Sequence, residues 1–179
     1  MKSSNIVIAF CRMNPFTAGH QKLIEKVKSL SHLLNAPHEI ILTHGHDHIK
    51  NPLSLKEKLY FARKFFRESK FKGTTKNTPT ILCHFDRLRE EGYKHITVVA
   101  GSDRTQGFQS LVDRYDISDV SVISAGDRMP DELTASKLRE AARNGDYATF
   151  KKGVPSRLKE QDIEELYLAT RKGLNLINT

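Results

Sequence analysis

An apolar run near the N-terminus leads through a polar loop into an amphipathic helix, and this unit constrains the fold more than any other stretch of the chain. Residues 5–11 are continuously apolar over the length of a strand, as expected for a strand buried on both faces of a parallel sheet. Apolar residues from Leu23 to Leu34 recur at helical spacing, with Lys and Glu on the opposite side. Residues 12–20 are therefore predicted to form a strand-to-helix turn.

This turn has the features of an anion site. The free N–H groups and the positive end of the helix dipole favour an anion there, and Gly19 allows close approach to the backbone. His20 can donate to phosphate oxygens from the first helical turn, and Arg12 and Lys22 add positive charge. A strand-turn-helix unit with a glycine is also common as a plain turn, so the segment alone leaves both interpretations open.

A second segment, residues 132–140, is predicted to begin another helix. Thr134 is a candidate N-cap, and an apolar stripe follows at Leu138, Ala141 and Ala142. Hydroxyls and cations at this helix start form a second candidate anion-binding end, made of Thr134, Ser136, Lys137 and Arg139. The alternative is a capped surface helix with solvated cations.

Strands and helices alternate along the rest of the chain. Strands are predicted at 38–43, 95–100 and 120–124, with a short one inside 70–77, and helices at 55–66, 79–91, 107–115 and 160–172, with Thr78 as the N-cap before Pro79. This order predicts an α/β fold of the Rossmann-like type, a doubly wound parallel sheet with helices on both faces. Ligands of such sheets bind at the carboxyl ends of the strands, where residues 12–20, 44–50 and 101–104 fall.

Two of these loops carry further candidate residues. The histidines and aspartate of residues 44–48 allow either a metal site or a polar wall of the substrate pocket, and we favour the wall, with no metal site. Candidate substrate-binding residues are His44, His46, Lys50 and Arg104. Asp103 is expected either to hydrogen-bond a ribose or acceptor group, or to cap the helix that follows.

Composition agrees with one domain. With 179 residues, of which 38% are hydrophobic, the chain suits a Rossmann-like unit at 1–145 with a C-terminal helical extension of the same domain at 146–179. The last helix, with Leu174, Leu176 and Ile177, either covers the sheet or forms a homo-oligomer interface. No stretch has the length of a membrane span or the apolar core of a secretion signal, so a soluble cytoplasmic protein is expected. Cys11 and Cys83 are expected to be buried, reduced thiols.

The formal net charge of +8 favours a polyanionic ligand, which includes nucleoside triphosphates and nucleic acid. The basic residues are dispersed along amphipathic helices, and the chain has no tryptophan and no aromatic-rich RNA-binding signature. Nucleic acid is therefore the weaker interpretation.

Taken together, three segments of the chain resemble the motifs of one enzyme superfamily. Its (His/Thr)-x-Gly-His loop is matched by Thr17, Gly19 and His20. Its Ile-Ser-x-Thr-x-x-Arg motif is matched by residues 133–136 with Arg139, and its strand ending in Gly-x-Asp is matched by residues 98–103. The chain thus resembles, over residues 6–143, the nucleotidyltransferase superfamily of nicotinamide mononucleotide (NMN) adenylyltransferases and cytidylyltransferases, and small nucleotidyltransferase-like proteins of bacteriophages. Thr17 replaces the commoner first histidine, and Leu-Thr-Ala replaces the usual Ile-Ser-Ser.

The resemblance implies transfer of a nucleoside monophosphate from a nucleoside triphosphate to a small phosphorylated acceptor, with release of pyrophosphate. It implies Mg²⁺ carried by the triphosphate, His20 and Thr17 at the α- and β-phosphates, and Ser136 and Arg139 at the β- and γ-phosphates. The implied catalytic residues are His20, Thr17 and Arg139, and the implied nucleotide-binding residues are Arg12, Asn14, Gly19, Gly101, Asp103, Thr134, Ser136 and Lys137. ATP with NMN as acceptor is favoured, and the alternatives are cytidylyl transfer to a phosphorylated alcohol and a non-catalytic nucleotide- or RNA-binding protein.

Overall fold

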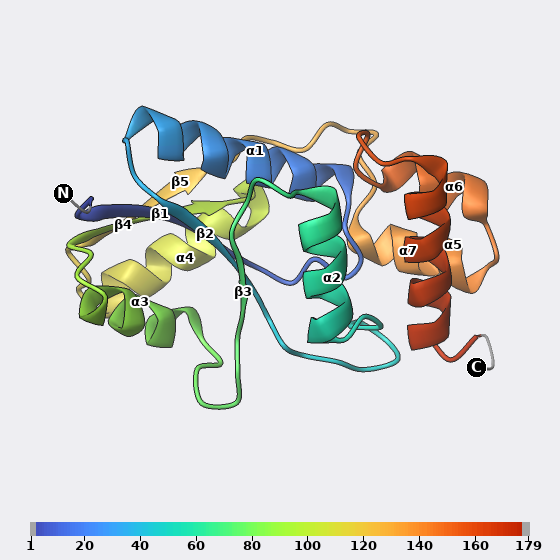
Figure 1. The fold of residues 1–179 in the computed structure, drawn as a ribbon, viewed down its shortest axis with the longest axis horizontal. Helices are drawn as coiled ribbons and strands as arrows, with labels where there is room; N and C mark the ends of the chain where they lie inside the picture. The colour runs from blue at the N-terminus through green and yellow to red at the C-terminus, as the bar shows by residue number, and fades with distance from the viewer. Residues whose placement is uncertain (1–2, 177–179) are drawn as a thin grey trace.

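The computed structural model describes residues 3–176 and is built on one parallel sheet of five strands in the order β3-β2-β1-β4-β5 (Figure 1). The strands are β1 (Asn5–Cys11), β2 (His38–Leu42), β3 (Phe71–Gly73), β4 (His95–Ala100) and β5 (Val120–Ser124). β1 is central and pairs with β2 on one side and β4 on the other, with Val7 opposite both His38 and Thr97. Because every pairing is parallel, the carboxyl ends of the strands lie along one edge of the sheet.

Helices cover both faces of this sheet, as predicted. They are α1 (Ala18–Leu33), α2 (Leu55–Phe65), α3 (Ile81–Glu90), α4 (Ser102–Arg114), α5 (Ala135–Arg143), α6 (Tyr147–Gly153) and α7 (Glu160–Gly173). Alternate residues of β1 enter two separate cores, because successive side chains of a strand point to opposite faces. Val7 and Ala9 pack with residues of α1, α2, α5, α6 and α7, whereas Ile6 and Ile8 pack with α3, α4 and β5. The Rossmann-like α/β fold is thereby confirmed.

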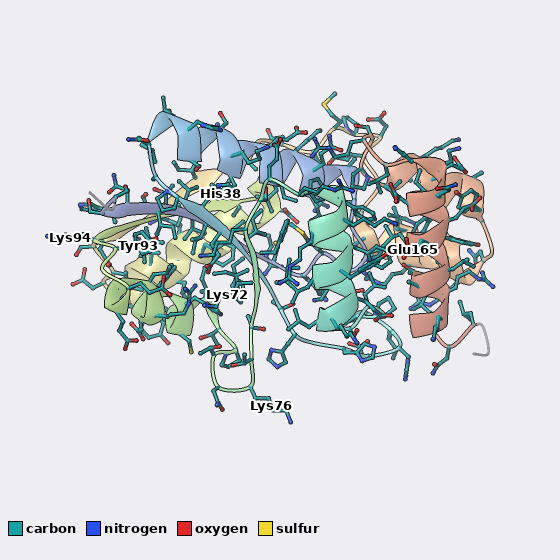
Figure 2. All side chains as sticks on the ribbon, viewed as in Figure 1. His38, Lys72, Lys76, Tyr93, Lys94 and Glu165 are labelled. Atoms are coloured by element: carbon teal, nitrogen blue, oxygen red, sulfur yellow. The ribbon has the colours of Figure 1, made fainter. Side chains whose placement is uncertain are left out.

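The C-terminal helices gather at one end of the molecule and share the first of these cores (Figure 1). Phe150 of α6 and Leu166 of α7 are fully buried in the same cluster as Val7. Figure 2 shows Glu165 between α7 and α2, where it forms an ion pair with Lys64. The last helix therefore packs onto the body of the fold. Ile177, which the sequence analysis groups with this helix, lies outside the described residues.

Two helix starts differ from the predicted ones. α3 begins at Ile81 and not at Pro79, because the Thr80 side chain accepts the Cys83 N–H as N-cap, while the N–H of Thr78 is held in a turn by Thr75 Oγ1 at 3.1 Å. α4 begins at Ser102, with Gly101 as its N-cap, and Gly107 lies inside it. An exposed helix tolerates an internal glycine at a cost of about 1 kcal/mol, so the glycine does not mark the helix start.

Candidate active site

A cavity of about 630 Å³ opens at the carboxyl edge of the sheet. Its walls are the ends of β1 and β4, the starts of α1, α4 and α5, and residues 125–128 after β5. Most of the predicted site residues line it: Arg12, Asn14, Thr17, Gly19, His20, Gly101, Asp103, Arg104, Thr134, Ser136 and Arg139. The three motif segments, far apart in sequence, thus meet around one space.

His20 lies in the first turn of α1 and forms a capping box with Thr17. The Thr17 backbone N–H donates to His20 Nδ1 at 3.0 Å, so Nδ1 is the acceptor and the ring proton of the neutral imidazole is on Nε2. Burial, with Arg128 and Arg12 nearby, lowers the pKa of His20 to about 4. The ring is therefore neutral at neutral pH, and its free N–H can donate to a ligand. Thr17 is thus the N-cap of α1.

Arg139 physically joins the start of α5 to the loop before α1. Its side chain is nearly buried, with 6% exposed, and Nη1 donates to the Asn14 carbonyl at 2.8 Å while Nη2 donates to Ser136 Oγ at 2.9 Å. Burial, reinforced by Arg12, lowers the pKa of Arg139 from its usual value. Thr134 caps α5 by accepting the Lys137 N–H, as predicted. The start of α5 is thereby held against the loop that follows β1.

Asn14 lines the cavity and is also bonded to the segment before α2. Its side-chain amide donates to the Leu53 carbonyl at 2.8 Å and accepts from the Leu53 N–H at 2.9 Å, and the residue is 1% exposed. Both ends of the amide are therefore bonded to the backbone of the segment before α2. These two bonds hold the loop of the cavity in place.

Lys58 is a buried cation beneath the cavity that the sequence analysis missed. Its Nζ donates to the Arg12 carbonyl at 3.1 Å and to the Thr43 carbonyl, so it connects the chain just after β1 to the chain just after β2. Burial lowers the pKa of Lys58 to about 8. Its position carried a signal, because Lys58 lies three residues after Leu55 and three before Phe61, on the apolar face of α2.

The cavity carries more positive than negative charge. Its basic residues are Arg12, Lys22, Arg104, Arg128 and Arg139, and its acidic residues are Asp103, Asp127 and Glu132. Asp103 lies in the first turn of α4, makes no side-chain cap and is 3.5 Å from Arg128, so the capping interpretation of Asp103 is wrong. Arg128 and Glu132 were not among the predicted site residues, since neither falls within the matched motifs.

The remaining predicted residues lie outside the lining of this cavity. Residues 44–50 turn towards β3 and α7, where His44 is held by the Thr74 hydroxyl and His48 lies 2.8 Å from the Gly173 carbonyl. Lys137 forms an exposed ion pair with Glu140 on α5. The polar wall predicted for residues 44–50 is therefore absent from this cavity: neither His44, His46 nor Lys50 is among its lining residues.

The sequence analysis left a metal site as the alternative not favoured, and it predicted two buried thiols. Within residues 3–176 there is no group of three or more His, Cys, Asp or Glu side chains placed to hold a metal ion. Cys11 and Cys83 are both free and only partly buried. None of the helices in that range is both long enough and apolar enough to cross a membrane.

Comparison with solved structures identifies proteins of similar fold. The chain superimposes on a bifunctional NMN adenylyltransferase/ADP ribose pyrophosphatase from Francisella tularensis with a TM-score of 0.63 and 16% identity, and on the same protein complexed with AMP and a Mn ion with 0.62 and 17%. It also superimposes on Thermotoga maritima TmcAL bound with alpha-thio ATP, with a TM-score of 0.60 and 10% identity.

These matches cover 94% of this chain but only 52%, 52% and 55% of the solved chains, so the chain spans about half of their length. No protein-family model matches the sequence, and comparison with curated proteins finds no significant match. At these identities the likeness shows the fold, which is that of proteins whose solved structures include bound nucleotides.

Proposed function

We propose that the chain is a nucleotidyltransferase that transfers a nucleoside monophosphate from a nucleoside triphosphate to a phosphorylated acceptor and releases pyrophosphate. The observation that carries this proposal is the hydrogen bond from Arg139 to the Asn14 carbonyl, which brings the start of α5 and the loop before α1 to one cavity. Helix N-termini favour phosphate, and here those of α1, α4 and α5 border the same space. The fold of the solved neighbours supports the same class of activity.

The chemistry follows from orientation and charge. His20 would donate from Nε2 to an oxygen of the α- or β-phosphate, and it needs no change of protonation because it is neutral. Ser136 and Arg139 would hold the β- and γ-phosphates of the departing pyrophosphate, while Arg12 and Arg104 add positive charge around the reacting groups. The protein then aligns the acceptor phosphate with the α-phosphorus and stabilises the developing charge, without a covalent intermediate.

A divalent cation fits this site as a companion of the triphosphate. Carboxylates of the cavity are Asp103, Asp127 and Glu132, and residues 3–176 form no three-ligand cluster that would hold the ion alone. Mg²⁺ commonly keeps several waters and binds mainly through substrate phosphates, which agrees with so sparse a set of protein ligands. Bound in this way, the cation would neutralise charge on the triphosphate oxygens.

Adenylyl transfer to NMN is our specific assignment. It is supported by the fold neighbours, an NMN adenylyltransferase and a protein bound to an ATP analogue. Asp103 and Arg104, at the start of α4, are the proposed contacts to the ribose or the acceptor.

The test is to incubate the protein with Mg²⁺, each nucleoside triphosphate and a panel of phosphorylated acceptors that includes NMN and phosphorylated alcohols, while pyrophosphate is measured. We expect release with ATP and NMN, a loss of at least about a hundredfold in His20→Ala, and no loss in His32→Ala, which removes an exposed histidine at the far end of α1. A well-folded His20→Ala protein with full activity contradicts the assignment. Salt-sensitive RNA binding without pyrophosphate release from any pair overturns the proposal.

A further inference from the structure

Glu132 places a carboxylate inside the cavity, against the start of α1. Its side chain is only 6% exposed, and Oε2 accepts from Lys22 Nζ at 2.8 Å and from the Met129 N–H at 3.1 Å. The other oxygen, Oε1, is buried and has no hydrogen-bond partner among residues 3–176. A Cβ atom placed on Gly19 would lie 2.5 Å from Oε1, so this oxygen occupies the space that the glycine leaves open.

This is the position at which the helix itself favours an anion. α1 has no acidic residue in its first turn, so Glu132 supplies from outside the negative charge that the helix end favours. We call the space bordered by the Gly19 backbone, Lys22 and the Met129 N–H the α1 anion site. The Glu132 carboxylate fills this site, but one of its oxygens is buried without a hydrogen-bond donor. Burial of such an unpaired polar atom is unfavourable.

Glu132 directly follows an exposed segment that belongs to neither core. Residues 126–131, between β5 and α5, are exposed, and Gly126 has a positive φ of 98°. Apart from Glu132, the ion pair that links this segment to the rest of the cavity wall joins Arg128 to Asp103 at 3.5 Å, with both side chains about half exposed. Exposed ion pairs of this kind contribute little, so breaking this pair has a small energetic penalty.

We propose that Glu132 is an internal competitor for phosphate: its carboxylate occupies the α1 anion site, and a polyphosphate ligand must displace it to bind. On displacement, Lys22 exchanges the carboxylate for a phosphate oxygen, and the unpaired Oε1 moves to solvent. The inference rests on the proposed function, since it takes the polyphosphate to be that of the nucleotide.

Inorganic tripolyphosphate is the sharpest probe, because it has neither base nor acceptor. Its affinity for the wild type, Glu132→Gln, Glu132→Ala and the control Glu68→Gln is measured by calorimetry at one salt concentration. Glu68 is exposed and pairs with Lys28, also on α1, so the control removes the same charge and an ion pair to a lysine of the same helix, away from the cavity. If Glu132 fills the site about nine-tenths of the time, both Glu132 variants bind tripolyphosphate about tenfold more tightly than the wild type and Glu68→Gln.

Hydrogen exchange supplies a second measurement on the unmodified chain. Adding tripolyphosphate to the wild type should increase exchange in residues 126–134, because the Met129 N–H loses the carboxylate that now binds it. Equal or weaker binding by both Glu132 variants, or unchanged exchange at saturation, overturns the inference alone. Absence of tripolyphosphate and ATP binding in every variant overturns the proposed function as well.

Discussion

At the scale of single residues, Thr17 sets the tautomer of His20, and burial sets its charge state. The Thr17 N–H occupies Nδ1, and burial lowers the pKa to about 4 from the ordinary 6.5. We predict that ¹⁵N NMR of the imidazoles shows His20 as the Nε2–H tautomer at neutral pH, with protonation only at pH well below 6.5. The His20→Gln variant assigns the resonance by its disappearance.

The same shift predicts a pH dependence of stability. Since the folded-state pKa is the lower one, the unfolded chain takes up a proton first as the pH falls, and the contribution of His20 to stability is full above pH 6.5 and is lost towards about pH 4. As the pH falls across this window, the free energy of unfolding measured with urea should therefore decrease more for the wild type than for His20→Gln. A parallel decline in both proteins, or a ring that titrates near its ordinary value, contradicts this account of the site.

Asn14 shows how a residue inside a motif can act through the backbone. Replacing it with Ala leaves both backbone groups of the buried Leu53 without their partner, which should lower the free energy of unfolding by about 2 kcal/mol or more. The exposed Asn77→Ala should change it by less than about 0.5 kcal/mol. Chemical denaturation measures both. Unchanged stability with reduced nucleotide affinity would instead assign Asn14 to direct binding.

At the scale of elements, the end of α7 is fixed by a close approach of two backbones. A Cβ on Gly173 would lie 1.9 Å from the Pro52 carbonyl oxygen, which cannot yield as a flexible side chain can. Gly173→Ala should therefore separate α7 from the segment before α2 and destabilise the protein by about 2 kcal/mol.

The chain contains a matched control for this substitution. Gly107 lies in α4, and a Cβ atom added to it would meet nothing within 4 Å, so Gly107→Ala should stabilise the protein by up to about 1 kcal/mol, as expected for an exposed helix interior. Thermal unfolding compares the two variants. Similar effects from both would mean that the contact between Gly173 and Pro52 is easily relaxed.

At the scale of the whole molecule, the sequence predicts those features of the fold and the site that local patterns determine. Apolar runs and helical spacing gave the alternating elements, and parallel pairing alone brings residues 12–20 and 101–104 to one edge. The course of residues 44–50 depends instead on α7, because His48 contacts the Gly173 carbonyl 125 positions away in sequence. Burial of Lys58 likewise depends on two carbonyl groups from different strand ends, and the Glu132 contact depends on Lys22, which is distant in sequence. Periodicity places Lys58 on the apolar face of α2, but it does not encode the partners in any of these contacts.

The shared core also predicts that the C-terminal helices unfold together with the sheet. Leu166 is fully buried in the cluster that contains Val7, whereas Leu168, two residues on, is 54% exposed. Leu166→Ala should lower the free energy of unfolding by about 3 kcal/mol and Leu168→Ala by less than about 1 kcal/mol. If the chain is one cooperative unit, hydrogen exchange in Leu166→Ala accelerates equally for the most protected amides of β1 and α7. Accelerated exchange in α7 with β1 unaffected would make the extension a separate unit.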